Sequence, residues 1–184
     1  IQEARGGAGL LRTSIINGCE PANQAVQALA SGAGTTLAVV ELAGGQARPY
    51  HAGDSIVLIV GLRGKIKLET TSHSPVGFGV EAGFLDAAEA MNHEHRHLVL
   101  NAIGSDAMRI EIGSAVKLAK RDTVLLASDG LTDNLTVGEI VEFIRKGRLD
   151  KALSQLAREC DQRMSGRQDP SKPDDLTIAA FRPT

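Results

Sequence analysis

The stretch TVLLASDGLTDN, residues 123–134, decides how this sequence is interpreted. Its first five residues are β-branched or aliphatic, a composition typical of a buried strand. Ser128, Asp129 and Gly130 follow directly, and Asp133 lies four residues beyond Asp129. The Asp129 carboxylate is therefore expected at a strand tip, where Gly130 lets a second backbone segment approach closely. Taken alone, Asp-Gly is also an ordinary strand-to-turn junction.

Two other segments place carboxylates at the ends of predicted strands. The sequence PDDLT at residues 173–177 carries an acidic pair, and AGDS at residues 52–55 carries a third carboxylate in a tight turn. Hard divalent cations such as Mg²⁺ and Mn²⁺ prefer oxygen ligands, and no cysteine or matching histidine accompanies these groups. The pattern therefore indicates a divalent-cation site.

The rest of the pattern predicts an α+β fold with antiparallel sheets. Residues 8–30 predict two helices interrupted at residues 18–21, and capping-box spacings begin two more helices, at Asp86 with Glu89 and at Thr136 with Glu139. Another helix carries an apolar stripe from Leu149 to Met164, and residues 165–173 read as a long loop. The predicted strands are residues 35–42, 47–52, 55–60, 65–70, 108–112, 115–118, 123–127 and 176–181.

The bulk composition narrows the classes of function. A chain of 184 residues with 42% hydrophobic and 23% charged residues fits one globular domain. A net charge of -2 and the absence of tryptophan argue against a nucleic-acid partner, and no apolar run approaches the roughly 20 residues of a membrane span. Cys19 and Cys160 are expected as free thiols, and residues 1–9 do not form a signal peptide, so the predicted location is cytoplasmic.

Six short motifs together resemble a known family. In chain order they are GTTL (34–37), GDS (53–55), TSHS (71–74), IG (103–104), LLASDG (125–130) and DDLT (174–177). This series is similar to that of the protein phosphatase 2C family, the metal-dependent protein serine/threonine phosphatases. The resemblance implies a sandwich of two antiparallel β-sheets flanked by helices (α-β-β-α). On this interpretation residues 1–184 are a single phosphatase-like domain, truncated at its N-terminus and lacking the N-terminal strands.

The resemblance also implies roles for particular residues. Asp129 and Asp174 match ligands of two Mn²⁺ or Mg²⁺ ions, and Asp54 matches the ligand of a weaker third ion. Asp133 lies where another acidic group near that third ion is found, and Gly130 stands where its backbone could contact a metal. The implied activity is hydrolysis of phosphoserine and phosphothreonine in phosphoproteins by a metal-activated water. No residue is assigned as a catalytic acid or base, and the oligomeric state and physiological substrate are not predicted.

The sequence departs from the family near its start. The family has a phosphate-contacting Arg and then an Asp-Gly-x-Gly-Gly segment, whereas Glu3-Ala4-Arg5-Gly6-Gly7 falls at the second position. Either the motif has degenerated or the chain lacks its true N-terminal segment. The first case favours an alternative function, a catalytically silent module that keeps the phosphatase fold and binds a partner.

A zinc metallopeptidase is the remote third hypothesis. Residues 93–97, HEHRH, match the H-E-x-x-H pattern, in which His93 and His97 would share one helix face with Glu94 beside them. Their polar neighbours instead favour exposed histidines. We expect His73 to be a locally hydrogen-bonded loop residue and Cys160 to lie in the core.

Overall fold

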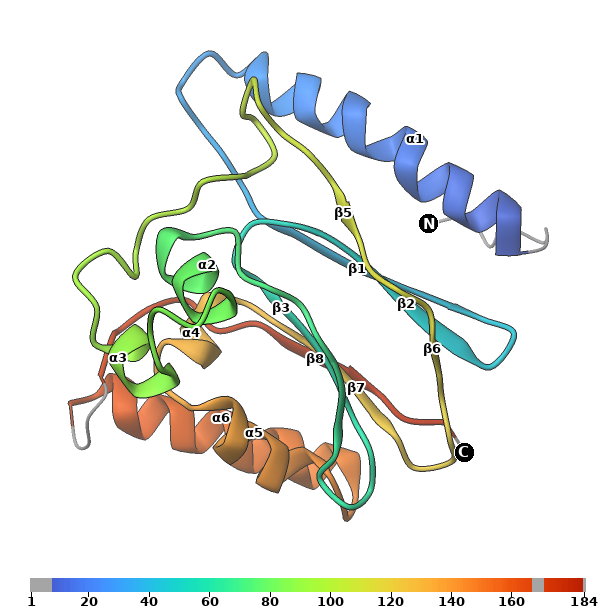
Figure 1. Ribbon diagram of the computed structural model, residues 1–184, viewed down its shortest axis with the longest axis vertical. Coiled ribbons are helices and arrows are strands. Elements are labelled where there is room, and N and C mark those ends of the chain that lie inside the picture. Colours follow the sequence, from blue (N-terminus) through green and yellow to red (C-terminus); the bar gives the residue numbers. More distant parts are fainter. Residues whose placement is uncertain (1–7, 167–170, 184) are drawn as a thin grey trace.

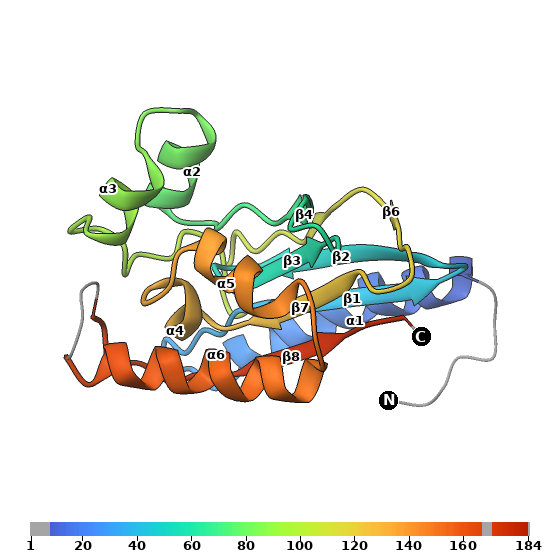
Figure 2. The same cartoon turned by 90° about the horizontal axis from the view of Figure 1, so that it is seen from below.

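The computed structural model describes residues 8–166 and 171–183. Two antiparallel sheets pack face to face, with helices on both outer sides (Figures 1 and 2). The α-β-β-α sandwich is thereby confirmed. One sheet contains β1 (Leu37–Ala43), β2 (Gln46–Ala52), β5 (Glu111–Ile112) and β6 (Val116–Lys117). The other has the order β4 (Ile66–Glu69), β3 (Ile56–Val60), β7 (Thr123–Ala127) and β8 (Ile178–Phe181).

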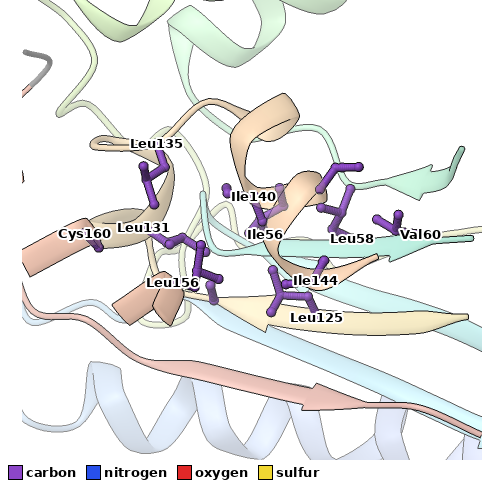
Figure 3. Close-up of a cluster of buried hydrophobic side chains, with 12 residues drawn as sticks. Ile56, Leu58, Val60, Leu125, Leu131, Leu135, Ile140, Ile144, Leu156 and Cys160 are labelled. Atoms are coloured by element: carbon purple, nitrogen blue, oxygen red, sulfur yellow. The ribbon is translucent and has the colours of Figure 1, made fainter. Parts of the chain in front are cut away.

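The main core lies between the second sheet and the helices α5 (Val137–Ile144) and α6 (Leu149–Met164). Strand β3 is buried at all five positions, as expected for a continuous apolar run covered on both faces. Leu58 packs toward the helices (Figure 3), whereas Ile59 packs between the two sheets with Ala47 and Val124. The carboxylate-bearing loops are therefore attached to the most thoroughly buried part of the molecule.

The N-terminal helical region differs from the sequence expectation. Residues 8–27 form one helix, α1 (Ala8–Gln27), with Pro21 inside it, so the prediction of two helices was wrong. A proline in a helix interior loses one backbone hydrogen bond, which costs about 3 kcal/mol. Packing of the inner face offsets that cost: Cys19 and Asn23 are buried, and Asn23 accepts a hydrogen bond from the Gly104 N–H.

Both predicted capping boxes are present. They begin α3 (Ala87–Met91) at Asp86 and α5 at Thr136. Two short helices were not predicted, α2 (Pro75–Glu81) and α4 (Asp129–Thr132). Helix α2 contains two glycines, which lower helix propensity, and it begins because the Ser74 side chain caps it. Helices α2, α3 and α4 lie at the same end of the sandwich (Figures 1 and 2).

Strands β5 and β6 are shorter than the predicted runs 108–112 and 115–118. Both pair with β2, on either side of Pro49. Proline has no N–H to donate, so the ladder is interrupted at Pro49 on this side of β2, whereas the ladder with β1 on the other side is continuous. Among the described helices, none is both long and apolar enough to cross a bilayer.

Candidate metal centre

Strand register brings three acidic segments to one end of the second sheet. Strand β7 lies between β3 and β8, and its last residue, Ala127, pairs with both Ile56 and Ile178. Because both pairings are antiparallel, the C-terminal end of β7 lies next to the N-terminal ends of β3 and β8, at one end of the sheet. Asp129 follows Ala127 by two residues, and the other two acidic segments immediately precede their strands. The predicted convergence of the carboxylates therefore follows from the ladder itself.

A backbone clamp fixes the distance between the Asp129 and Asp174 segments. A Cβ atom on Gly130 would lie only 2.5 Å from the Asp175 carbonyl oxygen, so this approach requires glycine. The Ser128 hydroxyl donates to the same carbonyl at 3.0 Å and accepts from the Thr177 N–H at 3.0 Å. The close approach expected at Gly130 is thus present.

Three of the predicted site residues form one carboxylate cluster, which comprises Asp129, Asp133 and Asp174. One carboxylate oxygen of each lies within 4.8 Å of the other two. Burial, followed by the charges of Asp133 and Asp174, raises the pKa of Asp129. The second acidic residue of the pair, Asp175, donates its backbone N–H to Asp174 Oδ1 at 2.8 Å, which is a turn contact. An assembly of this kind favours a cation among the carboxylates.

Asp54 faces the same cluster from the turn between β2 and β3. Burial, and then the charge of Asp129, raises the pKa of Asp54 to about 6 from its usual 3.8. Gly53 beside it has a φ of +110°, a conformation that favours glycine, and the His73 ring accepts its N–H. Asp54 thus occupies a partly buried, negatively charged position that is held by its neighbours.

The raised pKa of Asp54 gives a pH-dependent prediction for the metal-free protein. The folded state binds this proton more tightly than the unfolded chain, so its contribution to stability grows as pH falls through about 6 toward 4. Asp54→Asn should stabilise the metal-free protein by about 2 kcal/mol near pH 7.5 and leave it unchanged near pH 4. Urea unfolding of both forms in chelator at the two pH values tests this. An equal difference at both values would show that Asp54 ionisation is not the cause.

Lys172 lies among the carboxylates and was missed by reasoning from the sequence. Its Nζ forms an ion pair with Asp133 Oδ2 and lies 3.5 Å from Asp174 Oδ2 and 3.7 Å from Asp129 Oδ2. Burial lowers the pKa of Lys172, but the hydrogen bond to Asp133 and the surrounding negative charge outweigh burial and raise it overall. The one available signal was a lysine two residues before Asp174.

A cavity of about 350 Å³ adjoins the carboxylates, between the α2–α3 region and α4–α5. Its polar part includes Asp54, Asp129, Asp133 and Arg96. Its apolar wall is formed by Val76, Val80, Met91, Leu135 and Val137. The cavity is large enough to admit a side chain of another molecule next to the acidic residues.

The structure brings a second group of potential ligands together, His51, His73 and Glu111. His73 Nδ1 accepts from the Gly53 N–H at 3.1 Å and from Asn101 Nδ2 at 2.8 Å, so its proton is on Nε2, which donates to Glu111 at 3.0 Å. The protonated Nε2 is not free to bind a metal, and the His51 and His73 rings stack at 4.4 Å. His73 is therefore a loop residue, as expected from the sequence, but it is buried, and its hydrogen-bond partners lie 20, 28 and 38 residues away along the chain.

The H-E-x-x-H segment does not have the geometry of a zinc peptidase. Helix α3 ends at Met91, and residues 93–97 form turns, so His93 and His97 do not share a helix face. The described residues contain two potential metal-binding groups, and neither includes these histidines. The segment Glu3–Gly7, where the family's bridging motif would fall, lies outside the described residues.

Comparisons with known proteins identify the group to which the chain is related. No family model matches the sequence. Protein phosphatase PhpP of Streptococcus pneumoniae serotype 2 is 35% identical over 115 residues, which cover 61% of this chain and 46% of that protein. A serine/threonine phosphatase of S. agalactiae shares the fold with a TM-score of 0.79 over 94% of this chain and 70% of the other, at 27% identity. In sequence and in fold, this chain is similar to the 2C-type protein phosphatases.

The similarity to 2C-type phosphatases has a defined extent. The chain spans about half the length of the curated relatives it matches, 46% in the case of PhpP. The fold also matches the catalytic domain of the phosphatase PstP, solved in complex with two manganese ions, with a TM-score of 0.66 at 23% identity over 86% of this chain and 64% of that one. These relatives are named as protein phosphatases or serine/threonine phosphatases.

Proposed function

We propose that this chain is the greater part of the catalytic domain of a metal-dependent protein serine/threonine phosphatase. The observation that carries the proposal is the convergence of Asp129, Asp133 and Asp174 within 4.8 Å at the end of the central strand of a phosphatase sandwich. The substrates proposed are phosphoserine and phosphothreonine in proteins, which are the substrate class of the relatives named serine/threonine phosphatases.

The ligand set suits Mn²⁺ or Mg²⁺. It consists of carboxylate oxygens, the ligands that hard divalent cations prefer. The ammonium group of Lys172 lies beside all three carboxylates of the cluster, so the position accepts positive charge. We propose that Asp129 and Asp174 hold two ions, that Asp54 holds a third, weaker ion, and that Asp133 lies beside it. Manganese is bound by the structural neighbour PstP.

Gly130 is left out of the proposed ligand set. Its carbonyl oxygen accepts hydrogen bonds from Asn134 Nδ2 at 2.9 Å and from the Cys160 thiol at 3.1 Å. Both lone pairs of the oxygen are therefore already engaged by protein donors. The contribution of Gly130 is the close contact with Asp175 described above.

The proposed chemistry divides between the metal and the protein. Bound divalent cations would neutralise the phosphoryl oxygens and lower the pKa of a coordinated water. The protein would supply the carboxylates and orient the substrate. The cavity beside Asp54 and Asp129 provides Arg96 for electrostatic contact with an anionic group and an apolar wall for the residues flanking it.

Metal-dependent hydrolysis by the full-length natural protein tests this proposal. p-Nitrophenyl phosphate and a phosphothreonine peptide should both be hydrolysed with Mn²⁺, and hydrolysis should fall at least about 100-fold in excess chelator and return when Mn²⁺ is added. Activity that survives exhaustive chelation, or that returns with zinc alone, would contradict the proposed centre. A phosphotyrosine peptide tested in parallel measures the preference for serine and threonine.

We also propose a cytoplasmic location and phosphoproteins as the partners. Cys19 and Cys160 are both buried free thiols, as is usual in a reducing compartment. Localisation of the tagged full-length protein by microscopy and fractionation tests the location.

A further inference from the structure

The position of Lys172 bears on how the proposed centre takes up metal, and the inference below rests on that proposed function. The side chain reaches the oxygen atoms that a metal would use, Oδ2 of Asp129, Asp133 and Asp174. Its exposed fraction is 21%, and those of Asp129 and Asp133 are 34% and 14%. These ion pairs are therefore partly shielded from water, and are stronger than typical surface pairs.

The backbone holds Lys172 in place for this contact. Its N–H donates to Asn134 Oδ1 at 2.8 Å, and its carbonyl accepts from Asn134 Nδ2 at 2.9 Å. Asn134 is fully buried, and its Nδ2 also donates to the carbonyl of Gly130. The same amide group therefore ties Lys172 to the turn of helix that carries Asp129 and Asp133. Such double anchoring is not expected of a lysine that reaches the cluster by chance from a loose loop.

The ammonium group and a divalent cation compete for the same carboxylates. With no metal bound, the positive charge of Lys172 reduces the repulsion among three clustered carboxylates. A divalent cation on the same oxygens would lie within a few ångström of Nζ, where two like charges repel strongly in a partly buried site. Metal binding therefore requires the ammonium group to leave. The free energy of the ion pairs that it loses makes metal binding less favourable by the same amount.

We propose that Lys172 is an internal competitor of the metal: its ammonium group occupies the carboxylate cluster in the metal-free protein, and its displacement weakens and sets the affinity for the divalent cation. This role distinguishes Lys172 from a ligand or a catalytic group. It predicts that the protein is stable without metal and that metal uptake is shifted to higher metal concentrations.

The test uses Lys172→Met, which keeps most of the length of the side chain and removes its charge, in the full-length protein. Lys172→Arg is the charge-preserving variant, and Lys151→Met, on the exposed face of α6, is the matched control. Mn²⁺ affinity is measured by calorimetry, and melting temperature is measured in chelator and in saturating Mn²⁺. Neither measurement depends on phosphatase activity.

We expect Lys172→Met to bind Mn²⁺ at least about tenfold more tightly than the wild type, with Lys172→Arg closer to wild type and Lys151→Met unchanged. Its melting temperature should fall by several degrees in chelator and match the wild type in saturating Mn²⁺. A lysine with a purely structural role would instead lower the melting temperature in both conditions.

The outcomes separate this inference from the proposed function. Equal or weaker Mn²⁺ binding by Lys172→Met, with the wild type binding normally, overturns the competitor role and leaves the metal centre standing. Binding by neither protein overturns both proposals. Binding by Lys172→Met alone supports the competitor role, and shows that the lysine keeps the natural protein free of metal under those conditions.

Discussion

Asp129→Asn in the full-length protein is expected to lose Mn²⁺ affinity by about two orders of magnitude or more while remaining folded. Asparagine keeps the shape of the side chain but removes a charged ligand oxygen from the centre of the cluster. Without metal, the variant should melt at the same or a slightly higher temperature than the wild type. The reason is that burial and the charges of Asp133 and Asp174 already disfavour ionised Asp129.

Calorimetry with Mn²⁺ and melting temperatures with and without metal measure both effects. Asp161→Asn, at an exposed position on α6, is the matched control and should bind Mn²⁺ like the wild type. Unchanged metal affinity in Asp129→Asn would remove Asp129 from the centre. Collapse of the metal-free fold would instead mean that the Asp129 carboxylate has a structural role.

The sequence predicted the central features of the site because they depend on local rules. An apolar run followed by Asp-Gly predicts a strand that ends just before the aspartate, and Asp129 does lie two residues beyond the end of β7, at the start of α4. The capping boxes at Asp86 and Thr136 are likewise satisfied within four residues of chain. Such features are decided by neighbours in sequence, so they can be read without the tertiary structure.

The features that were missed depend on contacts distant in sequence. Pro21 favours a break in α1, but Asn23 reaches Gly104 and Ser105 across 81 and 82 residues, and that packing keeps the helix continuous. Lys172 is similar, since it is tied to Asn134 across 38 residues. A lysine between Ser171 and Pro173 has no local signature, so its place among the carboxylates is visible only in the folded chain.

Gly130→Ala should strongly destabilise the fold. The new Cβ would lie 2.5 Å from the Asp175 carbonyl oxygen and 3.1 Å from the Asp175 carbonyl carbon, both backbone atoms that cannot rotate away. We expect a loss of about 3 kcal/mol in the free energy of unfolding, as for strong overpacking of a rigid contact. Relief of the clash must separate the Asp129 and Asp174 segments, so Mn²⁺ affinity should fall as well.

Gly138→Ala is the control that isolates this steric cause. Gly138 is exposed in the first turn of α5, and the nearest atom to an added Cβ is Thr136 Oγ1 at 4.0 Å. Because alanine favours a helix over glycine, this variant should gain about 0.5–1 kcal/mol and bind Mn²⁺ normally. Urea unfolding in chelator gives the stabilities, and calorimetry gives the metal affinities. If Gly130→Ala were as stable as Gly138→Ala, the clamp between Gly130 and Asp175 would not hold the acidic segments together. If it lost stability but kept full Mn²⁺ affinity, the clamp would serve the fold alone.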